Sequence, residues 1–239
     1  MPPTRLLLPR LQFPSSPVQQ PRRTFLSSIL SSSPLPPQTL TASRRLPYNH
    51  AALYSLIADI DSYNTFLPYC SSSRVTSWTA HKDPEFSRRW PTRADLTAGW
   101  GGLEQTYTSR VFCVPGSIVE ALSGEGARSG IAPDILARYG LKDEPTSVSP
   151  STVGSANGGE EGVFKTLVTR WTVTPTTSNG RDGKVVQRTG EQTEWSDVSL
   201  NIRFQFANPL YGAVSSAVAD KIAPIMIEAF VERAKKVLG

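Results

Sequence analysis

Residues 208–239 read NPLYGAVSSAVADKIAPIMIEAFVERAKKVLG, and this stretch decides the fold. Asn208 is a good helix cap, and Pro209 suits the first helical position that follows it. The pattern predicts a helix of roughly 40 Å, at about 1.5 Å per residue. Its apolar residues recur at helical spacing and form one wide stripe, made of Leu210, Val214, Ala217, Val218, Ile222, Ile225, Met226, Ala229, Phe230 and Val237. So wide a stripe requires a broad apolar surface beneath the helix.

The segment before this helix supplies such a surface. From Val198 to Phe206, apolar residues alternate with polar ones, which is typical of an antiparallel strand with one buried face. Because the helix begins two residues later, we expect the buried face of this strand to pack against the helix stripe.

Upstream, the chain is mostly strand-like. A first strand is predicted at Gln38–Leu46, and a helix capped by Asn49 follows and ends at Asp61–Ser62. An aromatic segment, Tyr63–Tyr69, adds at most one more helical turn. Strand patterns then occupy Arg74–Thr79, Thr92–Trp100, Glu104–Val114, Ser117–Leu122 and Val163–Thr174. The order predicts an α+β fold, in which a curved antiparallel sheet of about six or seven strands holds the terminal helix.

Residues 124–162 interrupt this pattern, because they are rich in Gly, Ser, Pro, Glu and Asp. We predict an inserted, mobile surface loop with at most a short helix at Ile131–Leu141. The turn signals Asn179-Gly180 and Asp182-Gly183 mark a further connection. The predicted domain spans residues 37–239.

Residues 1–36 differ in composition from the rest. They are rich in Arg, Ser, Leu and Pro, and no acidic residue occurs before Asp59. This composition is typical of a mitochondrial transit peptide, with a plain disordered tail as the alternative. Four of the net +5 charges are arginines at or before Arg23. The body is therefore nearly neutral, and the basic face that nucleic-acid binding needs is not indicated.

Other function classes find little support in the residues. No apolar run reaches the roughly 18 residues of a membrane span, so we expect at most peripheral membrane contact. Cys70 and Cys113 are far apart and fit two reduced thiols. His50 and His81 are the only histidines, and neither belongs to a catalytic triad or a metal motif. We therefore expect a protein that is not an enzyme and carries no metal or resident cofactor.

A sheet curved around one helix does not close on it everywhere, and the gap is a default binding site. The expected lining residues are Phe66, Leu67, Pro68, Leu96, Phe164, Trp171, Leu200, Ile202, Phe204, Met226 and Phe230. For each of them, ordinary core packing is the alternative. Tyr69 is expected at the cavity mouth, in contact with membrane or partner, and the alternative is a cluster packed under a loop.

Two groups on the terminal helix leave further alternatives open. Ile227 and Val231 lie beside the stripe and are expected to meet a membrane or a partner, or else the inserted loop. Arg233 either contacts an oxygen of a bound ligand or a lipid phosphate, or pairs with an acid. Glu104 either binds a ligand or is an exposed strand carboxylate.

An ordered set of short motifs is similar to one family. It comprises Arg44–Tyr48, Leu53-Tyr54, Ala58–Ile60, Tyr63, Phe66–Cys70, Tyr107–Val111, Phe164, Leu167, Trp171, Phe204–Phe206, Asn208–Leu210, Met226-Ile227, Ala229-Phe230 and Arg233-Ala234. The set resembles the mitochondrial coenzyme Q-binding family of the START-like (polyketide cyclase/dehydrase) superfamily. It covers roughly residues 38–239 without the insertion. Four features depart from the family: the long insertion, the long loop His81–Arg89, Tyr69 in place of a tryptophan, and Pro224 inside the helix.

The resemblance implies a helix-grip fold and a non-catalytic lipid chaperone. Its ligand would be coenzyme Q (ubiquinone) or a biosynthetic precursor, in support of respiration and ubiquinone biosynthesis. Its implied place is the matrix side of the mitochondrial inner membrane, bound peripherally, with ubiquinone-biosynthesis proteins as partners. Two alternatives stay open: a cyclase or hydratase of the same fold, and a ribosome-associated interaction module.

Overall fold

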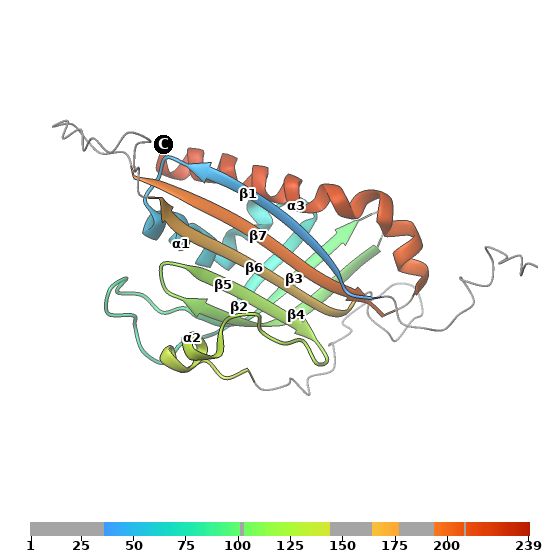
Figure 1. Cartoon of the computed structure of the whole chain (residues 1–239), viewed down its shortest axis with the longest axis horizontal. Helices are drawn as coiled ribbons and strands as arrows, with labels where there is room; N and C mark the ends of the chain where they lie inside the picture. The colour runs from blue at the N-terminus through green and yellow to red at the C-terminus, as the bar shows by residue number, and fades with distance from the viewer. Residues whose placement is uncertain (1–35, 101–102, 144–163, 177–193, 208) are drawn as a thin grey trace, which may run out of the picture. The chain divides into compact units, whose positions relative to one another are not determined.

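Seven antiparallel strands form one sheet in the order β1-β7-β6-β5-β4-β3-β2 (Figure 1). The strands are β1 (Gln38–Leu46), β2 (Cys70–Trp78), β3 (Pro91–Trp100), β4 (Leu103–Val114), β5 (Ile118–Gly124), β6 (Phe164–Thr176) and β7 (Trp195–Phe206). The helices are α1 (His50–Ala58), η2 (Ile60–Thr65, a 3₁₀ helix), α2 (Pro133–Arg138) and α3 (Pro209–Leu238). The predicted α+β helix-grip architecture is confirmed.

This computed structural model describes residues 36–100, 103–143, 164–176, 194–207 and 209–239, without the side chains of Trp100, Leu103 and residues 209–220. All of them belong to one unit, Pro34–Gly239. The predicted transit peptide and the turn signals at residues 179–183 lie outside the described residues.

The short-range signals place the elements well. The side chain of Asn49 caps α1, where its Oδ1 accepts hydrogen bonds from the backbone N–H groups of Ala51 (2.7 Å) and Ala52 (3.3 Å). Strand β7 alternates strictly between buried and more exposed residues, as its sequence predicts. Two boundaries were wrong. Helix α1 ends at Ala58, and the 3₁₀ helix η2 follows it. Strand β2 begins at Cys70 and not at Arg74, because its first residues pair with β3 although they show no apolar alternation.

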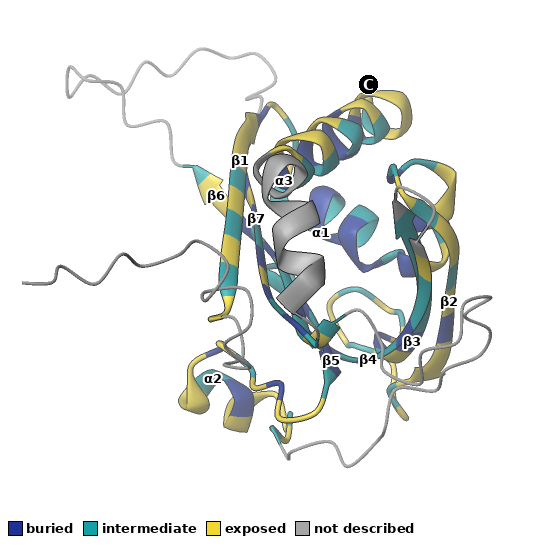
Figure 2. Cartoon of the chain, turned by 90° about the vertical axis from the view of Figure 1, so that its right-hand side faces the viewer, coloured by how far each residue is buried: buried dark blue, intermediate teal, exposed yellow. Residues whose placement is uncertain are grey.

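Irregular pairing bends the sheet. The β2–β3 register shifts between Cys70 and Ser72 and again between Val75 and Trp78, and the β6–β7 register shifts between Phe164 and Thr166. Such bulges bend a strand and increase its twist. In Figure 2 the sheet curves around α1 and α3.

Helix α3 packs against β1, β7 and α1. Its buried residues include Ala223, Ile227, Phe230, Val231 and Ala234. Ile227 (0% exposed) and Val231 (6%) therefore belong to the core, and their prediction as membrane or partner contacts was wrong. The helix meets two surfaces, sheet and α1, so more of its circumference is buried than one sheet requires.

The predicted stripe was also wrong at two positions of α3. Ile225 is 38% exposed and Val237 is 47% exposed. The buried arc is thus rotated from the predicted one, toward Ile227 and Val231. Pro224 is exposed, on the side away from the core, as its helical angle predicts.

The first part of the insertion is ordered, contrary to the predicted mobile loop. Ala127, Ile131 and Leu136 are buried against the outer face of the sheet, where they join Phe112, Val114, Leu122 and Val168 in a second core. The short helix α2 lies within the predicted Ile131–Leu141. Residues 144–162 of the insertion lie outside the described residues.

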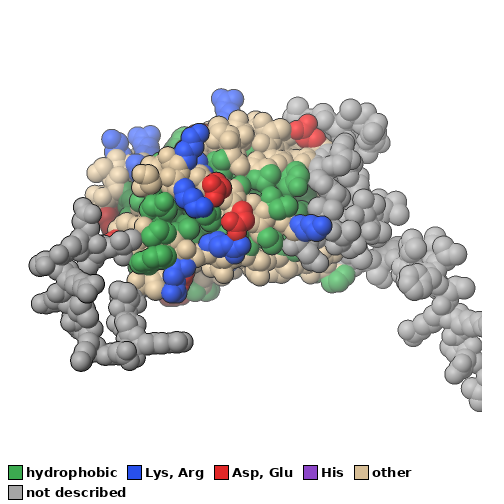
Figure 3. Space-filling model, turned by 90° about the horizontal axis from the view of Figure 1, so that it is seen from above, with side chains coloured by type: hydrophobic (Ala, Val, Ile, Leu, Met, Phe, Trp, Pro, Cys, Tyr) green, Lys and Arg blue, Asp and Glu red, His purple; other side chains and the backbone are tan. Residues whose placement is uncertain are grey.

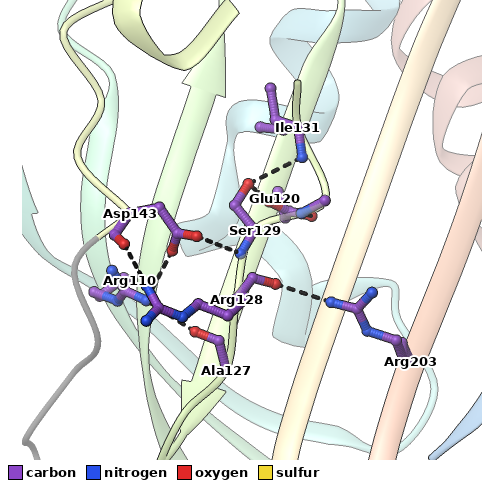
Figure 4. A network of polar contacts seen from close by, with 9 residues as sticks. Arg110, Glu120, Ala127, Arg128, Ser129, Ile131, Asp143 and Arg203 are labelled. Carbon is purple, nitrogen blue, oxygen red and sulfur yellow. Dashed lines mark hydrogen bonds and ion pairs between the residues drawn. The ribbon is translucent and has the colours of Figure 1, made fainter. Parts of the chain in front are cut away.

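Polar contacts hold the same segment in place (Figure 4). Glu120, fully buried on β5, pairs with Arg170 and accepts hydrogen bonds from the Ser129 hydroxyl (2.5 Å) and the Gly130 N–H (3.2 Å). Asp143 accepts from the Ser129 N–H (3.2 Å). Apolar burial with satisfied polar groups overcomes the loop-like composition.

The outer surface of α3 and β1 mixes charges of both signs. Figure 3 shows basic and acidic side chains close together among hydrophobic ones on the face seen from above. The ion pair Arg44–Glu228 links β1 to α3. Within the described residues, no helix has the length and apolarity to cross a membrane, and no group of three or more potential metal ligands occurs.

Candidate functional site

A cavity of about 280 Å³ lies between the inner face of the sheet and α3. This volume is close to the lower end of the roughly 300–1,000 Å³ that small-molecule pockets occupy. The described lining residues are Leu40, Ile60, Tyr63, Leu67, Pro68, Tyr69, Cys70, Leu96, Ala98, Gly99, Gln105, Tyr107, Ser109, Val119, Ala121, Ser123, Phe164, Leu167, Thr169, Trp171, Ile202, Phe204, Phe206, Ile222 and Met226. The helix and the sheet therefore do separate, as their curvature predicts.

The cavity exists because small residues occupy the middle of the sheet. Ser109 on β4 and Ser123 on β5 lie within hydrogen-bond distance of each other, and Ala121 is opposite Thr169 on β5 and β6. Ala98 and Gly99 add two more short positions on β3. Ile222 and Met226 of α3 line the same space.

Aromatic rings bound the space at two ends. Phe164 contacts Tyr107, Phe204 and Phe206, with ring centroids 5.7, 5.5 and 5.0 Å away. At the other end Trp171 packs on Phe230, with a centroid distance of 5.2 Å. The lining between them is mostly apolar.

The lining also carries neutral polar groups. The hydroxyls of Ser109 and Ser123 are hydrogen-bonded at 2.6 Å. The indole Nε1 of Trp171 is buried without a hydrogen-bond partner among the described residues. Burial raises the pKa values of the Tyr107 phenol and the Cys70 thiol, so both stay protonated near neutral pH.

None of the lining residues that the structure describes is Asp, Glu, Lys, Arg or His. An ionised ligand in this space would lose its hydration without gaining a counter-charge. The chemistry of the lining therefore favours a neutral molecule that presents hydrogen-bond acceptors, and the described groups supply no acid–base pair poised near neutral pH.

Tyr69 stands where the cavity meets the surface. It lines the cavity and is 41% exposed, and its backbone has φ of 67°. This left-handed conformation is strained for an aromatic residue. Its carbonyl oxygen accepts a hydrogen bond from the Gly99 N–H at 2.9 Å, which ties the loop to β3. The predicted position of Tyr69 at the mouth agrees with this geometry.

The structure brings most of the predicted lining residues together around one space: Leu67, Pro68, Leu96, Phe164, Trp171, Ile202, Phe204 and Met226. Three others do not line it. Leu200 and Phe230 are 1% exposed and lie in the main core. Phe66 packs edge-on against Tyr63. All three are apolar and inward-facing, and the pattern alone cannot separate lining from core.

Sequence reasoning missed the polar floor of Tyr107, Ser109, Ser123 and Thr169. Large apolar residues such as Phe112, Leu122 and Val168 occupy the alternate positions of the same strands. Taken as the cavity side, these apolar positions would indicate the outer face of the sheet instead of the inner one. The outer face of β4–β6 is itself buried under the insertion. The two-residue period of side-chain direction along β4, which places Tyr107 and Ser109 on one face, was the one signal that could have identified the floor.

Two charged residues with open roles lie outside the cavity lining. The guanidinium of Arg233 lies over the ring of Phe66, 5.7 Å from its centroid. Glu104 is exposed, and its carboxylate accepts a hydrogen bond from Ser71. Cys70 and Cys113 are free thiols, as predicted.

A curved antiparallel sheet that holds a long C-terminal helix over a cavity defines the START-like class of ligand-binding folds. A solved START superfamily protein from Mycobacterium smegmatis shares this fold, with a TM-score of 0.50, 9% identity, and coverage of 83% of this chain and 98% of that one. The family model described as polyketide cyclase / dehydrase and lipid transport matches residues 46–125 and 155–231. The chain belongs to that family.

Two relatives show where the chain lies within the family. It is 29% identical over 194 residues to the mitochondrial coenzyme Q-binding protein coq10 of Schizosaccharomyces pombe, which covers 81% of this chain and 85% of that protein. It is 25% identical over 197 residues to the ribosome association toxin RatA of Pseudomonas aeruginosa, which covers 82% of this chain and 95% of the toxin.

Proposed function

We propose that this protein binds coenzyme Q in the cavity beneath α3 and acts as a non-catalytic lipid chaperone. The observation that carries the proposal is an uncharged cavity of about 280 Å³, whose lining combines aromatic rings with hydroxyl groups and an indole N–H. A quinone ring fits such a lining, because it is flat, neutral and bears carbonyl acceptors. The similarity to a protein named for coenzyme Q binding supports the same ligand.

The cellular setting is part of the same proposal. The N-terminal composition and the mitochondrial names of relatives support import into mitochondria. We infer peripheral attachment at the matrix side of the inner membrane, delivery of ubiquinone to respiration, and contact with ubiquinone-biosynthesis proteins and precursors. Fractionation of disrupted mitochondria tests the attachment: the protein should sediment with the membranes at low salt and be released by alkaline carbonate, and recovery in the soluble matrix before carbonate treatment would contradict it.

The alternatives have less support. A cyclase or hydratase needs polar side chains in the cavity, and Tyr107, Ser109, Ser123 and Thr169 meet this requirement. However, the raised pKa of the Tyr107 phenol works against its use as a base. A ribosome-associated module needs no cavity, although a relative bears that name.

Extraction of the native protein followed by mass spectrometry tests the proposal. We expect ubiquinone in the extract of the wild-type protein. Ala121→Leu fills the cavity floor and should lower the bound quinone at least tenfold, with the fold intact. Ala137→Leu makes the same change on the exposed surface of α2 and should leave the quinone content unchanged. Phospholipid alone in the wild-type extract would contradict quinone binding.

A further inference from the structure

Trp171 is the lining residue with an unused hydrogen-bond donor. Its side chain lines the cavity and the residue is 3% exposed, and Nε1 has no partner among the described residues. An indole N–H only donates, and a buried donor without an acceptor destabilises the protein. An acceptor from outside the described residues would remove this cost.

The neighbours of Trp171 on the inner face of the sheet supply none. Its register partners are Val119 on β5 and Leu200 on β7, and Phe230 packs against its ring. All three have hydrocarbon side chains. Thr169, the preceding inward-facing residue of β6, carries a hydroxyl but does not bond Nε1. A molecule in the cavity can supply the acceptor that Nε1 lacks among the described residues.

A second polar group lies farther along the floor. Ser123 is in register with Leu167, four residues before Trp171 on β6, a distance of roughly 13 Å along the strand. A ring with oxygens at opposite edges can lie between the two groups. The Ser109–Ser123 hydroxyl pair donates or accepts equally well, so it contacts a carbonyl or a hydroxyl. The indole N–H can only donate a hydrogen bond, so it requires an acceptor on the ligand.

We propose that Trp171 makes the cavity selective for the oxidised quinone over the reduced quinol. This inference rests on the proposed function. A quinone carbonyl presents only lone pairs to the indole N–H. In the quinol, the same oxygen carries a proton, is a weaker acceptor, and brings a second donor next to the indole N–H. Trp171 is thus a specificity-determining residue of the binding site.

The selectivity has a redox consequence. Reduction of the bound ligand adds two electrons and two protons, Q + 2e⁻ + 2H⁺ → QH₂, with both supplied by an external reductant. Tenfold tighter binding of the quinone lowers its midpoint potential by about 30 mV. The protein would hold the quinone and release the quinol after reduction.

Binding of a short-chain ubiquinone, as quinone and after anaerobic reduction with dithionite, tests this inference. We expect the wild-type protein to prefer the quinone by about tenfold, the size of one hydrogen bond. Trp171→Phe keeps the ring and removes the donor, so the preference should fall below about twofold. Trp90→Phe is the matched control, because Trp90 is also buried (4% exposed) with an unpartnered Nε1 but does not line the cavity.

The outcomes separate the two proposals. Equal binding of quinone and quinol by the wild-type protein, or an unchanged preference in Trp171→Phe, overturns the inference about Trp171 and leaves quinone binding standing. Failure of the wild-type protein to bind either form overturns the proposed function. If Trp171→Phe does not fold, the indole proton resonance of Trp171 in the wild-type protein decides. A downfield shift with quinone and not with quinol supports the inference, and equal shifts contradict it.

Discussion

The inner and outer faces of strands β4–β6 are built from alternating residues of the same segments, yet they differ in packing and charge. On β5, Val119, Ala121 and Ser123 line the cavity, whereas Glu120 and Leu122 face the insertion. The inner face has small, neutral residues and an open space. The outer face is filled by apolar side chains, and its buried carboxylate has several partners. A filled face with a multiply bonded buried carboxylate is typical of a structural contact, while unfilled space lined by an unused donor is typical of a binding site.

Loss of the Glu120 carboxylate should have the largest effect on stability. Glu120→Ala leaves Arg170 without its buried partner and removes the acceptor for Ser129 and Gly130. We expect the free energy of unfolding to fall by about 3 kcal/mol, as for other broken buried pairs. Urea denaturation measures this change, and the affinity of the folded protein for quinone should be unchanged.

Glu125→Ala is the control for this change, because Glu125 is exposed. Its effect should be below about 0.5 kcal/mol. Similar losses in the two variants would show that the outer network contributes little to the stability of the sheet.

Truncation of one leucine on each face compares packing directly. Leu122, 2% exposed, lies in the second core, whereas Leu167 lines the cavity. Leu122→Ala should cost about 3 kcal/mol, and Leu167→Ala about 1 kcal/mol, because the cavity already removes part of the contacts of Leu167. Thermal or urea unfolding of both variants provides the measurement. Equal costs would mean that the inner face is packed as densely as the outer one.

The alkaline pH dependence of stability tests whether the inner face is dry beyond the cavity. Cys113 does not line the cavity, and burial raises the pKa of its thiol from 9.0 to about 12. Above pH 9 the unfolded chain loses this proton and the folded protein keeps it. The stabilising contribution is thus complete below pH 9 and falls by about 1.4 kcal/mol per pH unit as the pH rises toward 12.

Unfolding free energies measured at pH 7, 9 and 10 provide the check. Cys113→Ala should reduce the slope between pH 9 and 10, whereas Cys70→Ala at the half-buried site should change it less. If Cys113→Ala does not change the slope of unfolding free energy against pH, the Cys113 thiol is in contact with water, and the inner face is hydrated beyond the cavity.

Local signals located most elements, because each depends on residues close together in the chain. The cap at Asn49, the alternation of β7, and the helix that starts after Asn208 are of this kind. The insertion was mispredicted because its order comes from Ala127, Ile131 and Leu136, which meet an outer sheet face that composition does not reveal. Ile227 and Val231 were mispredicted for a similar reason, because α3 packs against α1 as well as against the sheet.

By itself, the amino-acid sequence determined the α+β class, the terminal helix and its strand partner, because periodicity and capping act within a few residues. Only the tertiary structure decided which inward-facing residues line a space and which fill it. Leu200 and Phe230 pack in the core while Ser109, Ser123 and Trp171 surround the cavity, and this division depends on how far a bent sheet stands from its helix. That separation is set by pairing between distant strands, which no local pattern of residues encodes.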